Sequence, residues 1–263
     1  MQPADAFTLT LIQPDIRWEQ PAKNLALYER LFPTQPTDAV ILPEMFTTGF
    51  TMNAAGVAEP MYGATMQWMQ KMASALQCCI AGSLIIAENG HFYNRFVWVY
   101  PDENQEPTCY DKRHLFRMGK EHETYTPGNR QVYVAYKGWQ IMLQVCYDLR
   151  FPVWSRNNPH NPYHLLLYVA NWPQVRSYPW VQLLKARAIE NLCYVAGVNR
   201  VGADGHGVYH SGNSLLLNFK GEPLWTKQDE TAVYTHTLSY PDLEQFRQQF
   251  AALQDADDFG WVG

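Results

Sequence analysis

The feature that most constrains the fold is a continuous apolar run, LLLYVA, at residues 165–170. A strand with one face in water alternates apolar and polar side chains, whereas a strand buried on both faces is apolar throughout. This run therefore predicts a central strand whose sheet is covered on both sides. Helices or a second sheet must supply those covers.

Shorter strand-like runs recur along the chain and alternate with helical patterns. Two of them flank the turn Glu88-Asn89-Gly90 and two flank Gly138, which predicts two hairpins. The predicted strands are 7–12, 39–42, 80–86, 92–100, 132–136, 139–146, 165–170, 194–198, 214–218 and 232–238, and the predicted helices are 21–31, 61–76, 180–192 and 242–253. This alternation predicts an α/β fold with a mixed sheet. No linker or repeat interrupts the chain, so we expect one domain over residues 1–263.

Composition excludes several classes of protein. Hydrophobic residues make up 47% of the chain and charged residues 17%, which is typical of a globular protein. The formal net charge is −5, so nucleic acid is not an expected partner, because phosphate binding needs a basic face. No apolar stretch approaches the roughly 18 residues of a membrane span, and the first residues do not resemble a secretory signal. We therefore expect a cytoplasmic protein with no membrane partner.

The cysteines raise the question of which thiol is reactive. They are Cys78, Cys79, Cys109, Cys146 and Cys193. Their odd number and the lack of a CxxC pair argue against disulfides and thiolate zinc, and no HExxH pattern indicates a zinc hydrolase. Cys146 follows an apolar strand and precedes Arg150, so a helix N-terminus and a nearby cation are expected to lower its pKa. The other four are predicted to be packing residues.

Two further segments place a charged side chain near the end of an apolar strand. Glu44 follows such a strand and is surrounded in sequence by Leu, Pro, Met and Phe, so desolvation is expected to raise its pKa into the range of a general base. Lys112, next to Asp111, can hold positive charge where an oxyanion develops. The alternatives are a structural carboxylate for Glu44, a charged surface turn for Lys112 and a buried structural cysteine for Cys146. In open α/β sheets, ligands bind at the carboxyl ends of strands, so these residues and Cys146 form one candidate site.

Together, Glu44 in LPEMF, Lys112 in YDKRHLF and Cys146 in VCYDLRFP resemble the catalytic residues of the nitrilase (carbon–nitrogen hydrolase) superfamily. ANWP at 170–173 and ARAIEN at 186–191 extend the resemblance over the rest of the chain. It implies a four-layer α-β-β-α sandwich with mixed sheets, a homodimer or larger assembly, and no metal or organic cofactor. It also implies a second glutamate, which corresponds to Glu121 or, alternatively, to Glu123.

Within the superfamily the chain most resembles the ω-amidases, which hydrolyse the terminal amide of 2-oxoglutaramate or 2-oxosuccinamate. The resemblance implies that Glu44 takes the proton of the Cys146 thiol, which attacks the amide carbon. Lys112 and the backbone N–H of Tyr147 would hold the oxyanion, and Glu121 would orient the amide or Lys112. The alternative is another amidase of the superfamily, acting on deaminated glutathione, a carbamoyl compound or a nitrile.

A substrate of this kind carries a carboxylate, which a guanidinium binds well. Arg150 is the predicted cation, and the alternative is that it pairs with Asp148. The expected pocket walls are Asn171, Trp172, Phe46 and Phe116. The tail carries two large aromatic residues, Phe259 and Trp261, which are expected either to dock on a protein surface or to fray.

Overall fold

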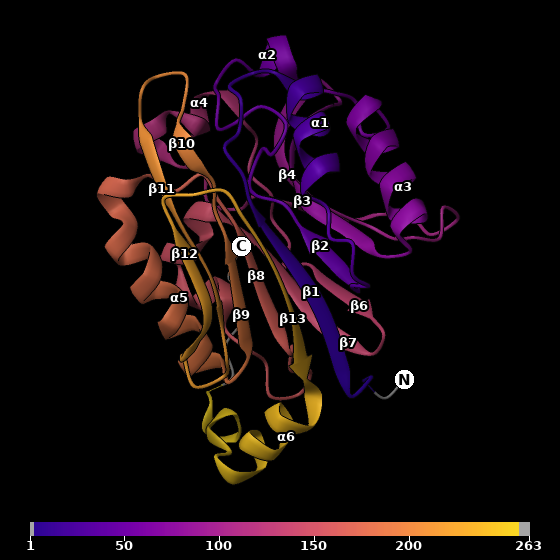
Figure 1. Ribbon diagram of the computed structural model, residues 1–263. Coiled ribbons are helices and arrows are strands. Elements are labelled where there is room, and N and C mark those ends of the chain that lie inside the picture. Colours follow the sequence, from indigo (N-terminus) through magenta and orange to yellow (C-terminus); the bar gives the residue numbers. More distant parts are fainter. Residues whose placement is uncertain (1–2, 258–263) are drawn as a thin grey trace.

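The computed structural model describes residues 3–257 and contains two β-sheets packed face to face (Figure 1). The first sheet has the order β13-β1-β2-β3-β4-β5 and the second the order β10-β11-β9-β8-β7-β6, with β12 beside β11. The first contains β1 (Ala6–Gln13), β2 (Ala39–Ile41), β3 (Cys79–Glu88), β4 (His91–Val99), β5 (Thr108–Asp111) and β13 (Ala232–Ser239). The second contains β6 (Tyr133–Tyr136), β7 (Trp139–Val145), β8 (Leu165–Val169), β9 (Tyr194–Val198), β10 (Val201–Ala203), β11 (Tyr209–Leu217) and β12 (Pro223–Gln228).

Both sheets are mixed, as the sequence predicts. In the first, β1, β2 and β3 are parallel to one another, while β13, β4 and β5 join by antiparallel pairing. In the second, β7, β8 and β9 are parallel, and β6 and β11 flank them antiparallel. The predicted hairpins are the β3–β4 and β6–β7 pairs. Their turns place Asn89 at φ 51° and Gly138 at φ 79°, in the left-handed region that such tight turns require.

Helices cover the outer face of each sheet, which gives the layer order α-β-β-α. On the first sheet, α1 (Pro21–Leu31) and α3 (Ala64–Leu76) pack through residues such as Tyr28 and Met69. On the second, α5 (Ser177–Asn191) packs through Trp180 and Leu184. The helix α6 (Tyr240–Gln249) starts with Pro241 in its first turn, as predicted. The predicted fold class is confirmed.

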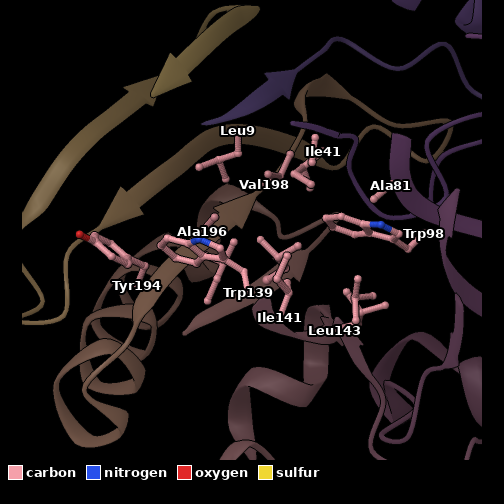
Figure 2. Close-up of a cluster of buried hydrophobic side chains, with 14 of the residues drawn as sticks. Leu9, Ile41, Ala81, Trp98, Trp139, Ile141, Leu143, Tyr194, Ala196 and Val198 are labelled. Carbon is pink, nitrogen blue, oxygen red and sulfur yellow. The ribbon is translucent and has the colours of Figure 1, made fainter. Parts of the chain in front are cut away.

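The main core lies between the two sheets. Figure 2 shows side chains of the first sheet, including Leu9, Ile41 and Trp98, facing Trp139 and Ile141 of the second. These side chains are buried almost completely, so burial of apolar surface between the sheets is the main force that holds the layers together.

The run at 165–170 occupies the expected place. Leu165, Leu167 and Val169 face the core between the sheets, and Leu166 and Tyr168 face α5. All five residues of β8 are buried, because one face is covered by a sheet and the other by a helix.

The structure contains elements that the apolar pattern does not show. The strands β5, β10 and β12 and the short helices α2 (Ala54–Val57) and α4 (Glu121–Thr124) are absent from the predicted set. Most are short, and β12 at the sheet edge has no fully buried residue, so their apolar signal is weak. The aromatic residues Phe259 and Trp261 lie outside the described residues. Within 3–257, no helix is long and apolar enough to cross a membrane.

Candidate active site

The three reactive residues singled out in the sequence meet at one place. Glu44 follows β2, Lys112 directly follows β5, and Cys146 directly follows β7. The first two strands belong to one sheet and the third to the other, so the site forms where the two sheets face each other. Lys112 and Cys146 line the same cavity.

Lys112 is the centre of a buried ionic cluster. Its Nζ lies 2.9 Å from Oε1 of Glu44, and 3.0 and 2.9 Å from Oε1 and Oε2 of Glu121. All three side chains are completely buried. Buried charges are costly to desolvate unless they are paired and hydrogen-bonded. The hydrogen bonds of Lys112 to both carboxylates therefore fix the positions of all three side chains.

The electrostatics of the cluster favour a charged lysine. Burial by itself lowers the pKa of Lys112, but the charges of Glu121 and Glu44 outweigh burial and hold the pKa above its ordinary value. Burial raises the pKa of Glu121, and the neighbouring Lys112 offsets only part of that effect. The site therefore contains a permanent cation beside carboxylates.

Glu44 lies in a polar environment rather than the apolar one that its neighbours in sequence suggest. Asn94 Nδ2 donates to its Oε1 at 2.8 Å, and the backbone N–H of Asn171 donates to its Oε2 at 2.8 Å. Asn171 Nδ2 also donates to the backbone oxygen of Glu44 at 2.5 Å. The alternative of a charged surface turn does not fit Lys112, which is buried, and the general-base role of Glu44 stays a prediction.

Of the two candidates for the second glutamate, Glu121 contacts Lys112 and Glu123 does not. Glu121 starts α4 with its side chain fully buried on Lys112, and it also accepts a 2.6 Å hydrogen bond from the backbone N–H of Phe116. Glu123 is exposed two residues further along the same helix. The orientation of α4 against Lys112 separates the two glutamates, and the sequence alone does not contain that information.

Cys146 sits in a tight turn with unusual backbone geometry. Its φ is 45°, in the left-handed region that non-glycine residues rarely adopt, and the residues after it form a 3₁₀ turn to Arg150. Asp148 holds this turn: it accepts hydrogen bonds from the backbone N–H of Val145 at 3.0 Å and from the Tyr110 hydroxyl at 2.7 Å. It also accepts from the backbone N–H of His114 at 3.0 Å, which ties the turn to the segment after Lys112.

The expectation of a lowered thiol pKa is wrong. Burial raises the pKa of Cys146 well above its ordinary value, and the negative charge of Glu44 and a hydrogen bond to it raise it further. Lys112 opposes this shift but does not cancel it. The side chain of Cys146 is therefore a thiol next to the Glu44 carboxylate, not a preformed thiolate. Cys78, Cys79 and Cys193 are fully buried packing residues, as predicted.

The cavity in front of Cys146 has a volume of about 230 Å³, which is small for a ligand site. Its lining residues are Phe50, Met52, Lys112, Phe116, Gly119, Cys146, Tyr147, Arg150, Asn171, Trp172, Pro173, Arg176, Asp204, His206, Val208 and His210. The predicted walls Phe116, Asn171 and Trp172 are among them, as are Tyr147 and Arg150. The oxyanion role of the Tyr147 N–H stays a prediction.

Phe46 does not line the cavity, so its assignment as a wall is wrong. Its ring is fully buried on the outer side of the first sheet, 5.4 Å from the ring of Tyr28 and 6.3 Å from that of Trp68. The chain turns sharply at Met45 (φ 43°). Phe50 and Met52, a few residues later, line the cavity instead.

Arg150 is exposed, and its guanidinium lies 5.3 Å from the centre of the Trp172 ring. The alternative pairing with Asp148 is absent, because Asp148 is buried and its oxygens bind Val145, Tyr110 and His114. Among residues 3–257 no carboxylate forms an ion pair with Arg150.

Several cavity and cluster residues were not predicted from the sequence. Asn94 interrupts the apolar run at 92–100, and that interruption was a usable signal. Arg176 follows ANWP by three residues, and the β10–β11 hairpin contributes Asp204 and His206 from far along the chain. In the described part of the chain, no group of three or more His, Cys, Asp or Glu side chains is arranged to hold a metal ion.

Comparison with known proteins identifies the family of the chain. The model of the carbon-nitrogen hydrolase family matches residues 8–248, and the chain belongs to that family. It is therefore a hydrolase that acts on carbon–nitrogen bonds, in the nitrilase superfamily.

Individual relatives narrow the comparison. The chain is 45% identical over 253 residues to the omega-amidase YafV of Escherichia coli K12, covering 95% of this chain and 97% of that one. It is 28% identical, with the same coverage, to the 2-oxoglutaramate amidase of Bacillus subtilis. The solved structure of XC1258 from Xanthomonas campestris, a CN-hydrolase superfamily protein with an arsenic adduct in its active site, superposes with a TM-score of 0.93 at 42% identity, covering 98% and 100% of the two chains.

Proposed function

We propose that this protein hydrolyses the terminal amide of a small 2-oxo dicarboxylic acid monoamide, such as 2-oxoglutaramate or 2-oxosuccinamate, to the acid and ammonia. The observation that carries the proposal is the buried Glu44–Lys112–Glu121 cluster next to the Cys146 thiol. Lys112 and Cys146 line a small cavity that also contains Arg150, which has no ion pair among residues 3–257. The similarity to an omega-amidase and to a 2-oxoglutaramate amidase supports the choice of substrate.

The first half of the reaction forms a thioester. Glu44 takes the thiol proton while Cys146 Sγ attacks the amide carbon, because a thiol with a raised pKa needs an adjacent base. The developing oxyanion is held by the charge of Lys112 and by the Tyr147 N–H. When the carbon–nitrogen bond breaks, Glu44 returns its proton to the nitrogen and ammonia leaves.

The second half releases the acid. Water attacks the thioester carbon and gives a proton to Glu44, and the carbon–sulfur bond then breaks. Glu44 returns the proton to the thiolate, which restores the thiol for another turnover. Glu121 keeps Lys112 in place through both halves by its two hydrogen bonds.

Arg150 binds the carboxylate at the far end of the substrate in this proposal. It lies on the Trp172 ring with no ion pair among residues 3–257, so it is available for an anion. The small cavity volume favours a short substrate over a larger amide such as deaminated glutathione.

The test is ammonia release from 2-oxoglutaramate by the wild type, Cys146→Ala and the control Cys193→Ala, a buried thiol outside the cavity. Loss of the nucleophile is expected to reduce turnover at least about a thousandfold, and the control is expected to keep most of its activity. Mass spectrometry after rapid quenching is expected to find the acyl group on Cys146. Normal turnover by Cys146→Ala would contradict the thioester mechanism. A preference above tenfold in kcat/KM for a nitrile or carbamoyl substrate would contradict the assignment of 2-oxo-acid monoamides as the substrate class.

We also propose a homodimer in the cytoplasm. All five cysteines are free, which suits a reducing compartment. Tyr178 and Ile189 on α5 expose large apolar side chains that a second copy would cover. Light scattering coupled to size-exclusion chromatography tests the assembly, and a monomer at micromolar concentration would contradict it.

A further inference from the structure

A second arginine lines the cavity. Arg176 immediately precedes α5, and its guanidinium lies 5.2 Å from the centre of the Phe116 ring. Arg150 lies in the same way on the ring of Trp172. The cavity thus has two guanidinium groups, each on an aromatic wall, and an arginine in that position keeps its N–H edge free for a carboxylate.

Trp172 connects the two arginines. Its ring supports Arg150, and its Nε1 donates a 2.6 Å hydrogen bond to the backbone oxygen of Arg176. The tryptophan is itself fixed, because its backbone N–H donates to Asn199 Oδ1 at 2.8 Å and its ring packs on Trp180. The buried Trp172 therefore supports the guanidinium of Arg150 and holds the backbone of Arg176, and such a fixed support reduces the entropy lost when an anion binds.

Neither guanidinium is neutralised. In the described part of the chain neither forms an ion pair, and the polar contact of Arg176 is a 3.9 Å approach to Met118 Sδ. The lysine of the cavity is already balanced by Glu44 and Glu121. The cavity is also lined by the carboxylate of Asp204. Its Oδ1 accepts hydrogen bonds from the backbone N–H groups of His206 and Val208, so it stabilises the local turn and forms no ion pair with either arginine.

We propose that Arg176 is a specificity-determining residue that binds the substrate carboxylate together with Arg150, and that the pair selects 2-oxo-acid amides over amino-acid amides. The two guanidinium groups attract the carboxylate and the partly negative oxygen of the 2-oxo group. The same cations repel the 2-ammonium group of an amino-acid amide such as L-glutamine, so discrimination has an attractive and a repulsive part. This inference rests on the proposed function.

The experiment compares Arg176→Gln with the wild type on 2-oxoglutaramate, L-glutamine and pentanamide, which has a terminal amide but no charge. Arg176→Gln is expected to raise KM for 2-oxoglutaramate at least tenfold with kcat within about threefold, and to leave pentanamide unchanged. The preference for 2-oxoglutaramate over L-glutamine is expected to narrow, and Arg176→Lys to restore part of the affinity.

Arg117→Gln is the matched control, because Arg117 is exposed on the neighbouring 3₁₀ turn and does not line the cavity. It is expected to change KM less than twofold, which separates a direct contact from long-range attraction. Equal losses on all three amides in Arg176→Gln would show a structural role and overturn the inference. An unchanged KM for 2-oxoglutaramate would overturn it as well.

A binding measurement separates this inference from the proposed function. Calorimetry with glutarate, a dicarboxylate, on the Cys146→Ala protein requires no turnover. A glutarate Kd that rises tenfold or more with Arg176→Gln supports the anion site even if 2-oxoglutaramate is not hydrolysed. A Kd that does not change overturns the anion site even if the amidase activity is confirmed.

Discussion

Lys112 Nζ and the carboxylate of Glu121 form two hydrogen bonds, at 3.0 and 2.9 Å, with both side chains fully buried. Because Nζ also bonds Glu44 at 2.9 Å, the lysine cannot move towards either carboxylate without lengthening its bond to the other. The position of the Lys112 ammonium group is therefore set by Glu121 as much as by Glu44.

Glu121→Gln is expected to abolish most of the activity, because a neutral amide holds Lys112 less firmly and leaves Glu44 to pair with it alone. We expect a fall in kcat of at least about a hundredfold, measured by ammonia release. The control is Glu123→Gln on the exposed side of α4, which is expected to behave like the wild type. Equal activities of the two variants would contradict the role given to Glu121.

Asp148→Asn is expected to destabilise the turn that carries Cys146. One of the two carboxylate oxygens becomes an NH₂ group, which faces donors such as the Val145 N–H and the Tyr110 hydroxyl. Leaving such donors unsatisfied lowers the free energy of unfolding by about 3 kcal/mol. Urea denaturation measures the change, and Asp102→Asn is the control, since Asp102 is an exposed carboxylate that also accepts a backbone N–H. Similar losses in both variants would refute this account of Asp148.

The left-handed backbone at Cys146 predicts an unusual ranking of two variants. At φ 45° an alanine keeps the steric strain of a left-handed backbone, whereas a glycine has no Cβ and relieves it. The energetic cost of this strain is about 1–2 kcal/mol per residue. Cys146→Gly is therefore expected to be at least as stable as Cys146→Ala by thermal or urea unfolding. At Cys193, whose φ is not positive, the glycine variant is expected to be the less stable, and the same order at both sites would argue against strain.

The buried His164 predicts acid sensitivity. Its Nδ1 accepts the backbone N–H of Gln140 at 3.0 Å, and burial, followed by the charge of Arg247, lowers the pKa of His164 to about 4. An unfolded histidine titrates near 6.5, so the unfolded chain binds the proton more tightly. The contribution of His164 to stability is complete above pH 6.5 and is lost as the pH falls from 6.5 towards 4.

The effect can be measured with His164→Gln, which keeps an acceptor but cannot titrate. Between pH 7.5 and pH 5.0, the wild type is expected to lose about 2 kcal/mol more of its free energy of unfolding than this variant. His122→Gln, at an exposed position, is expected to follow the wild type. Identical pH dependences of the free energy of unfolding in the wild type and in His164→Gln would show that His164 does not cause the acid sensitivity.

Much of the fold followed from apolar patterning. The run at 165–170, the hairpin turns and the helical stripes predicted an α/β fold with a mixed sheet covered on both faces, because burial of apolar surface depends on the order of side chains along each element. The sandwich of two sheets was implied only by the resemblance to the nitrilase superfamily. Glu44 and Cys146 were also found from the sequence, since each stands at the end of a predicted apolar strand. Lys112 was found from its place beside Asp111 and from the order of the three motifs that resemble the superfamily. The short strands and helices were missed, because they bury too few side chains to leave a pattern.

The tertiary structure decided what surrounds these residues. It placed Phe46 in a core and Phe50 at the cavity, and it selected Glu121 over Glu123. It also raised the pKa of Cys146, which the neighbouring cation suggested would fall. Each of these outcomes depends on distances between segments far apart in the chain and on the exclusion of water, whereas a sequence reports only which residues are neighbours along the backbone.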